Sequence, residues 1–495
     1  MGESLTSRTI RGAAWTLSTT LGSRVVGLLG TLLLARYLTP AKYGEVMAAQ
    51  IVTLIAFAST TFGVGIYLIS NRDVTRAEVF HATCWFNAIG ALALGLVWAL
   101  SGPLGIWLEA PNLGDYMPWF VFALLLDRIA YVPERMLIRQ LRFRWLSLAK
   151  AAGELVFTGM SLGLAAREFG AMSIVYASVA RSTLRFCAIV PAVGWREWIE
   201  PHRLHVETLR KIIKTGVTIS IAGIATLLQR RGDNLLVSVF FGNATMGAYN
   251  YAYNLADTPA VAIGEQLSDV VAAAFPHAEG AKRQTALVRA CTMTSLIMFP
   301  LAFGLGAVAE TVAKAFFDEK WRSEGLGQML MLLSIVSAPR PMAHILHAYF
   351  FATQRIRMVL VQEWVSLALL MGAIATLGRL DIMWTCRAVG VAFVLRTLLL
   401  MWAVRRWDGI PLRRFLVPLI RPLLVCVAMV GVIALVRPML GDLAPVLRLP
   451  IEIGLGAAIY LAGALLVFRD ASREVIGMVR SSLSGRRGGG GGSDS

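Results

Sequence analysis

Fourteen long apolar runs dominate the sequence, and each is long enough to cross a bilayer as an α-helix. Such a helix needs about 20 apolar residues. Of the 495 residues, 57% are hydrophobic and 16% are charged. Because lipid offers no hydrogen-bond partners, continuous apolar stretches predict helices, whereas a membrane β-barrel would show short alternating segments. The chain is therefore predicted to be an all-α polytopic membrane protein, with spans near residues 13–38, 45–69, 81–101, 116–134, 146–166, 171–194, 214–241, 246–272, 290–312, 326–350, 359–378, 382–404, 415–436 and 449–468.

Basic residues are unevenly divided between the two sets of connections. Of the 47 lysines and arginines, 28 fall in the termini and the connections of one side, against nine on the other side. Connections rich in lysine and arginine stay on the cytoplasmic side, so both termini are predicted to be cytoplasmic. The same asymmetry explains most of the net charge of +17, and no nucleic-acid partner is expected.

The seventh span aligns with the first without gaps at an offset of 203 residues. Under this offset Arg11 falls on Lys214 and Gly44 on Gly247. Six intervening spans would leave both copies crossing in the same direction, as in transporters built from two parallel repeats. Chance similarity between two apolar helices is the alternative. The predicted organisation is an N-lobe of spans 1–6 (1–200), a C-lobe of spans 7–12 (201–408), two additional helices (409–470) and a flexible cytoplasmic tail (471–495).

The connections are short, and the longest covers about residues 195–209. None is large enough for a catalytic domain, and no nucleophile stands with a base, so transport is favoured over an enzymatic activity. The five cysteines show no paired spacing, so neither disulfides nor a metal site are expected.

Ten arginines and no lysine remain inside the spans. An arginine at bilayer depth is costly and normally faces a cavity or a partner. Its planar guanidinium fits phosphate oxygens bidentately, which indicates a phosphate-bearing cargo. The alternative is that these arginines pair with intramembrane carboxylates or extend to the interface, which is favoured for Arg387, Arg396 and Arg421. The candidate diphosphate-binding residues are Arg24, Arg230, Arg181, Arg185 and Arg340.

A polar stripe lies on one face of the eighth predicted span. It contains Asn250, Asn254, Asp257 and Glu265, which fall within about 80° of one another at helical spacing. These groups are candidates for contacting sugar hydroxyls or for carrying a coupling proton, and a polar seam between packed helices is the alternative. His344, one turn after Arg340 in the tenth span, is a further candidate for proton coupling.

Two strings carry a family resemblance. Residues 34–45 read LARYLTPAKYGE, and residues 232–254 read GDNLLVSVFFGNATMGAYNYAYN. The first resembles the exit of the opening span, and the second the start of the second half, in bacterial polysaccharide flippases of the multidrug/oligosaccharidyl-lipid/polysaccharide exporter superfamily. The resemblance covers roughly residues 5–475 and implies two six-helix lobes around a basic cavity, working by alternating access in the bacterial inner membrane.

The resemblance implies a function as well as a fold. It implies transfer of a polyprenyl-diphosphate-linked oligosaccharide from the cytoplasmic to the outer leaflet, for exopolysaccharide, capsule or O-antigen assembly. Contact with a polysaccharide polymerase and export machinery is expected. No cofactor is expected, and the drive would be a proton, sodium or the membrane potential. A peptidoglycan-precursor (lipid II) flippase and a cation-coupled multidrug efflux transporter are the alternatives, although ten intramembrane arginines argue against cationic drugs.

Overall fold

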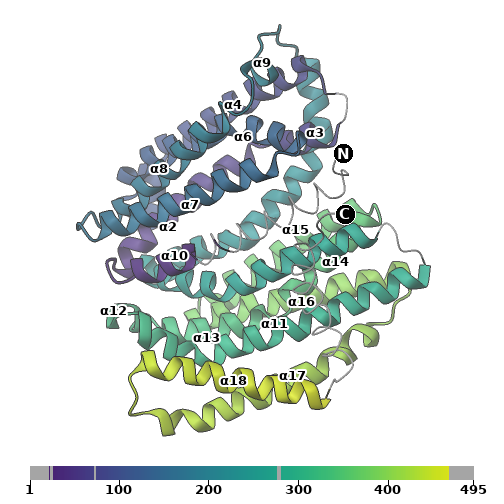
Figure 1. Ribbon diagram of the computed structural model, residues 1–495. Helices are drawn as coiled ribbons and strands as arrows, with labels where there is room; N and C mark the ends of the chain where they lie inside the picture. The colour runs from purple at the N-terminus through teal and green to yellow at the C-terminus, as the bar shows by residue number, and fades with distance from the viewer. Residues whose placement is uncertain (1–21, 23–25, 72–73, 276–279, 468–495) are drawn as a thin grey trace, which may run out of the picture. The chain divides into compact units, whose positions relative to one another are not determined.

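The computed structural model describes residue 22 and residues 26–71, 74–275 and 280–467, and within these ranges the chain is helical without strands (Figure 1). Each predicted span from residue 45 onward is mostly helical, and the second and tenth contain breaks. The main helices are α2 (Pro40–Ser59), α3 (Val64–Ser70), α4 (Arg76–Ala99), α5 (Ser101–Trp107), α6 (Leu113–Arg139), α7 (Phe143–Ala165), α8 (Met172–Ile189), α9 (Trp195–Trp198), α10 (Val206–Ala274), α11 (Gly280–Phe316), α12 (Glu319–Arg322), α13 (Leu326–Ser337), α14 (Arg340–Ala352), α15 (Ile356–Ala373), α16 (Ile382–Asp408), α17 (Leu412–Val436) and α18 (Pro445–Val467).

In the described part of the chain, eight helical segments are long and apolar enough to cross a membrane. Helices α7 and α8 fall outside this set because they carry charges within their length, such as Glu154 and Arg181. These charges are paired with one another, as described below, so a helix that carries them remains compatible with a bilayer. The all-α polytopic class predicted from the sequence is confirmed.

The chain divides into two compact units. Unit 1 comprises Met1–Ala252, Phe316–Leu326 and Arg357–Ala388, and unit 2 comprises Tyr253–Ala315, Gly327–Ile356 and Val389–Ser495. In unit 1, α6 packs against α2, α4 and α8, and α7 packs along α8. The lobe boundary near residue 200 stays a prediction.

The second predicted span, 45–69, is broken and not continuous. Helix α2 ends at Ser59 and α3 begins at Val64, with Phe62 and Gly63 in the left-handed region at φ 44° and 66°. A helix end inside lipid leaves carbonyl groups without partners. The guanidinium of Arg128 is the partner of two such carbonyl groups, because it donates to the carbonyl oxygens of Phe57 (3.3 Å) and Thr60 (3.2 Å). Arg128 is fully buried and is therefore a structural residue of unit 1.

Helix α10 contains a break at Gly242, where φ is 78° and ψ is 172°. Only glycine adopts this conformation readily. The break lies between the predicted spans 214–241 and 246–272, which follow each other without a loop. The residues after Gly242 begin a second helical segment that packs on the start of α2.

That packing is reciprocal. A Cβ atom at Gly44 would clash with the carbonyl oxygen of Asn243, and one at Gly247 would clash with the carbonyl oxygen of Pro40. Asn243 lies 203 residues after Pro40, as Gly247 lies 203 residues after Gly44. Two repeats related by a twofold axis would produce such a pair of exchanged contacts. The contact therefore supports the repeat inferred from the sequence.

Unit 2 contains α11, α13, α14, α17, α18 and most of α16. Helices α17 and α18 form a hairpin and lie side by side (Figure 1). The buried carboxylate of Glu452 in α18 accepts from Arg437 (3.3 Å) and Arg448 (2.9 Å). Arg437 also donates to the carbonyl oxygen of Ala307, which fixes the hairpin to α11.

Candidate functional site

The tenth predicted span is also broken, and the break places Arg340 at the first position of a new helix. Helix α13 ends at Ser337 and α14 begins at Arg340. The hydroxyl of Thr397 in α16 donates to the carbonyl oxygen of Pro339 at 3.3 Å, which satisfies one carbonyl group freed by the break. The interruption thus places Arg340 at the start of a helix within unit 2.

Arg340 forms an ion pair with Asp257 of α10, and the distance from Nη1 to Oδ1 is 2.6 Å. Only 10% of the Arg340 side chain and 16% of the Asp257 side chain are exposed. The Arg340 guanidinium also lies over the rings of Phe393 (4.2 Å) and Tyr253 (5.3 Å). The structure thus brings together two residues that the sequence proposed separately, one for diphosphate binding and one for coupling.

The pair holds a cation that can bind an anion. A carboxylate offsets the cost of holding a guanidinium inside the membrane. A phosphate group is tetrahedral, but two of its oxygens can accept from the planar guanidinium, so Arg340 is chemically suited to a phosphate as well as to a carboxylate. The two aromatic rings beside the guanidinium favour a cation at this position. His344 lies one turn further along α14 and is half-buried.

Arg181 and Arg185 in α8 belong to a different cluster, in unit 1. Arg181 pairs with Glu154 at 3.5 Å. Arg185 pairs with Asp127 at 3.4 Å and with Glu134 at 3.3 Å. These two arginines therefore match the alternative considered from the sequence, in which intramembrane arginines pair with carboxylates.

Glu134 is the centre of this cluster. It also lies 3.0 Å from Lys150 and 3.6 Å from Arg135, so three basic side chains converge on one carboxylate that is only 7% exposed. The sequence predicted that the helix would end at Pro133 and Glu134, but α6 continues to Arg139. The convergence of cations explains how an acidic residue is accommodated there.

Asn250 lies in a buried hydrogen-bond network in unit 1. Its Nδ2 donates to Oδ1 of Asn234 at 2.8 Å, and its Oδ1 accepts from the hydroxyl of Tyr43 at 3.1 Å. Tyr249 continues the network by donating to Asp233 at 2.7 Å. All five residues are buried. The two strings that carry the family resemblance thus pack against each other through these side chains.

The remaining candidates have fewer described contacts. Arg230 is half-buried on α10, and Asn254 is half-buried with its carbonyl oxygen bonded to Thr258. The side chain of Glu265 and the whole of Arg24 lie outside the described residues. Their roles stay predictions.

Sequence reasoning missed the two rings beside Arg340. Tyr253 stands within the string 232–254, and its position four residues before Asp257 signals a shared helix face. Phe393 comes from α16, 53 residues after Arg340 in the sequence, and no local pattern marks it. Asn234 as a partner of Asn250, and Asp233 as a partner of Tyr249, also escaped notice, because only the break at Gly242 turns the two segments of α10 toward each other.

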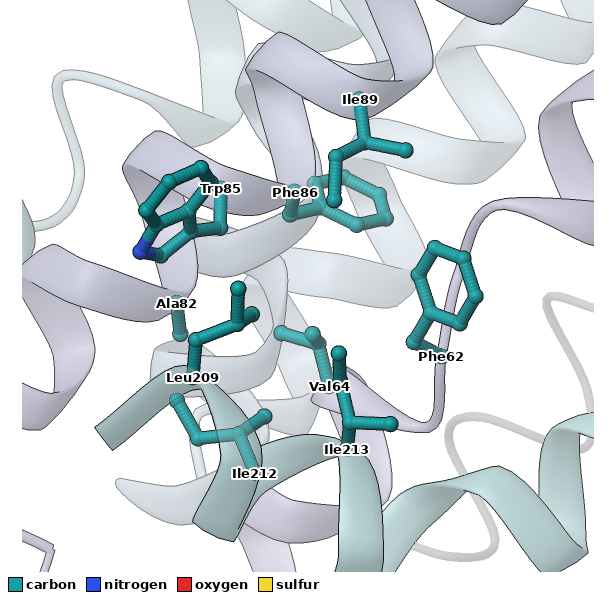
Figure 2. A pocket seen from close by; sticks show the side chains of 9 residues that line it. All are labelled: Phe62, Val64, Ala82, Trp85, Phe86, Ile89, Leu209, Ile212 and Ile213. Atoms are coloured by element: carbon teal, nitrogen blue, oxygen red, sulfur yellow. The ribbon is translucent and has the colours of Figure 1, made fainter. Parts of the chain in front are cut away.

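Unit 1 contains a small apolar pocket at the break between α2 and α3 (Figure 2). Figure 2 shows Phe62 of the break facing Phe86 of α4 and Ile213 of α10. None of its described lining side chains is charged. The pocket therefore offers packing space and not a site for a diphosphate or a sugar.

Comparison with known proteins gives a family match and several relatives. A family model described as polysaccharide biosynthesis protein matches residues 33–324. The chain is 23% identical to the succinoglycan biosynthesis transport protein ExoT of Rhizobium meliloti (strain 1021), over 97% of this chain and 98% of the relative. It is 24% identical to the teichuronic acid biosynthesis protein TuaB of Bacillus subtilis (strain 168), over 92% and 95%.

Solved structures share the fold. A lipid II flippase MurJ in an inward closed conformation superposes with a TM-score of 0.74 at 16% identity, covering 92% of this chain and 99% of that chain. An inward-facing multidrug resistance MATE family transporter of the MOP superfamily gives a TM-score of 0.61 at 15% identity, covering 78% and 95%. At these identities the likeness concerns the fold alone.

Proposed function

The chain is a multi-pass membrane protein of the polysaccharide biosynthesis protein family, and on this basis we propose that it is a lipid-linked oligosaccharide flippase. Its cargo is a polyprenyl-diphosphate-linked oligosaccharide, which it moves from the cytoplasmic to the outer leaflet by alternating access. The product serves exopolysaccharide, capsule or O-antigen assembly. The observation that carries the proposal is the Arg340–Asp257 pair, an anion-binding cation held beside a replaceable carboxylate within unit 2.

Arg340 acts in this proposal as the diphosphate ligand. In the empty transporter it is neutralised by Asp257. The cargo diphosphate takes the guanidinium, and Asp257 is then left without its cation. When the diphosphate leaves on the outer side, Asp257 pairs with Arg340 again.

The membrane potential assists the same step. Moving one negative charge outward across an inside-negative membrane is favourable by about 2.3 kcal/mol per 100 mV. The proposal places both termini on the cytoplasmic side of the bacterial inner membrane, where the basic connections lie. Partners in this setting are the polymerase and export proteins that use the flipped lipid.

Single and double neutral variants of the pair test the proposal. The host gene is replaced by R340Q, D257N or the double variant, and polyprenyl-linked oligosaccharides are quantified by mass spectrometry in each leaflet. R340Q alone leaves the Asp257 carboxylate without its cation, whereas the double variant removes both charges, so no unpaired charge remains. We expect the complete oligosaccharide lipid to accumulate on the cytoplasmic side in R340Q and in the double variant. Normal flipping in the double variant would mean that the pair is structural.

The same experiment separates the alternatives. Accumulation of the peptidoglycan precursor in place of another glycan lipid would identify a lipid II flippase. Unchanged glycan lipids together with raised drug sensitivity would identify an efflux transporter. R387Q is the matched control, because Arg387 is an exposed arginine whose guanidinium lies 4.7 Å from the Trp384 ring.

A further inference from the structure

An open groove runs between α11 and α17 in unit 2. One wall is a face of α11, because its lining positions recur at intervals of three and four residues, as expected for one side of a helix. The other wall is the start of α17. The lining residues are Gln284, Thr285, Val288, Arg289, Thr292, Met293, Arg414 and Pro418. None of them belongs to the Arg340–Asp257 site.

The groove is positively charged. Each wall contributes one exposed arginine, Arg289 from α11 and Arg414 from α17, and none of the described lining residues is acidic. The acidic residue at its edge is Asp408, whose carbonyl oxygen accepts from Gln284 at 2.8 Å. Arg355 binds both carboxylate oxygens of Asp408, at 2.6 and 3.1 Å. The carboxylate of Asp408 is therefore paired with Arg355, which does not line the groove.

Apolar surface continues from the two arginines. Val288, Met293 and Pro418 line the groove itself. Next to it, α17 exposes Val417 (59%) and Leu424 (63%), which in a bilayer contact acyl chains. Arg414 stands two residues after the start of α17, in a connection whose basic residues predict the cytoplasmic side. The arginines therefore lie at the depth of lipid headgroups, with acyl-chain surface beside them.

We propose that this groove binds an anionic phospholipid of the cytoplasmic leaflet. The lipid phosphate lies between Arg289 and Arg414, and one acyl chain follows Val288, Met293 and Pro418. Guanidinium groups bind phosphate through paired hydrogen bonds. A basic residue near the membrane surface contributes about 1 kcal/mol to binding of anionic lipid, which corresponds to about a fivefold change in dissociation constant. The proposal is independent of the identity of the transported cargo.

The test is a lipid titration of the full-length protein followed by native mass spectrometry. Phosphatidylglycerol and phosphatidylcholine of equal chain length are compared for the parent protein, R289Q, R414Q and R413Q. We expect tighter retention of phosphatidylglycerol by the parent, and roughly fivefold weaker retention in R289Q and in R414Q. R413Q is the matched control, because Arg413 is exposed and basic but does not line the groove, and its retention should equal that of the parent.

Three results would overturn the proposal. The first is equal retention of the two lipids by the parent. The second is equal loss in R413Q and R414Q, which would indicate attraction to a generally basic surface. The third is weaker retention of a polyprenyl diphosphate with unchanged phosphatidylglycerol, which would make the groove part of the cargo route. Thermal unfolding without added lipid checks that each variant is folded, and R414Q alone remains decisive because Arg414 is exposed.

Discussion

Two polar groups on α10 stand two helical turns apart and have opposite characters. Asn250, in unit 1, exchanges hydrogen bonds with Tyr43 and Asn234 in a buried network. Asp257, in unit 2, pairs with Arg340, a cation that also suits a phosphate. The hydrogen bonds of Asn250 to Tyr43 and Asn234 join neutral groups and do not compete with an anion, whereas an ion pair responds to a competing anion. A polar stripe on one helix can therefore contain both a structural hydrogen-bond network and a candidate anion-binding residue pair.

The largest expected effect is on transport, at the ion pair. Replacing Arg340 with Ala removes the charge-assisted bonds to the diphosphate, which contribute about 1.5–3 kcal/mol. We expect flipping to fall roughly ten- to a hundredfold, measured as appearance of the oligosaccharide lipid in the outer leaflet. R340K should recover part of the activity, because lysine keeps the charge without the planar fork. Full flipping activity in R340A would mean that the Arg340–Asp257 pair is structural, like the network around Asn250.

The next effect is on folding, at the reciprocal glycine contact. In G44A the added Cβ clashes with the carbonyl oxygen of Asn243, a backbone atom that cannot move alone. Overpacking of this kind costs about 1–3 kcal/mol. We expect a lower thermal unfolding temperature, and an equal loss in G247A if the two sites are equivalent by symmetry. G163A serves as the control, because a Cβ there meets no atom within 4 Å.

A comparable loss of stability is expected at the buried network, without a specific loss of transport. N250A leaves the Asn234 side chain without one buried partner, at a cost of about 1–3 kcal/mol. We expect a lower unfolding temperature, whereas flipping per folded molecule stays near the parent value. A selective loss of flipping with unchanged stability would instead assign Asn250 to the sugar-binding role considered from the sequence.

The smallest effect is expected at the cluster around Glu134. R185A removes the cation that lies 3.4 Å from Asp127 and one of three cations that approach Glu134, where Lys150 and Arg135 remain. Partly exposed ion pairs contribute about 0–1 kcal/mol, so a small decrease in unfolding temperature and near-normal flipping are expected. A loss of flipping as large as that of R340A would place a second diphosphate contact in unit 1.

The sequence by itself determined the class, the spans and the family, because these depend on local quantities. Apolar length predicts a membrane helix wherever it occurs. Strings such as LARYLTPAKYGE remain recognisable without any knowledge of their neighbours. The offset of 203 residues was also visible, because a repeat is a property of the sequence.

Only the tertiary structure decided which intramembrane polar groups meet. Arg181, Arg185 and Arg340 are alike in the sequence, yet the first two meet carboxylates within unit 1 and the third meets Asp257 beside two rings. Asn250 and Asp257 share a face of α10, yet their partners come from different helices. The physical reason is that the cost of a buried charge or amide depends on what packs against it, and those partners lie far away in the chain.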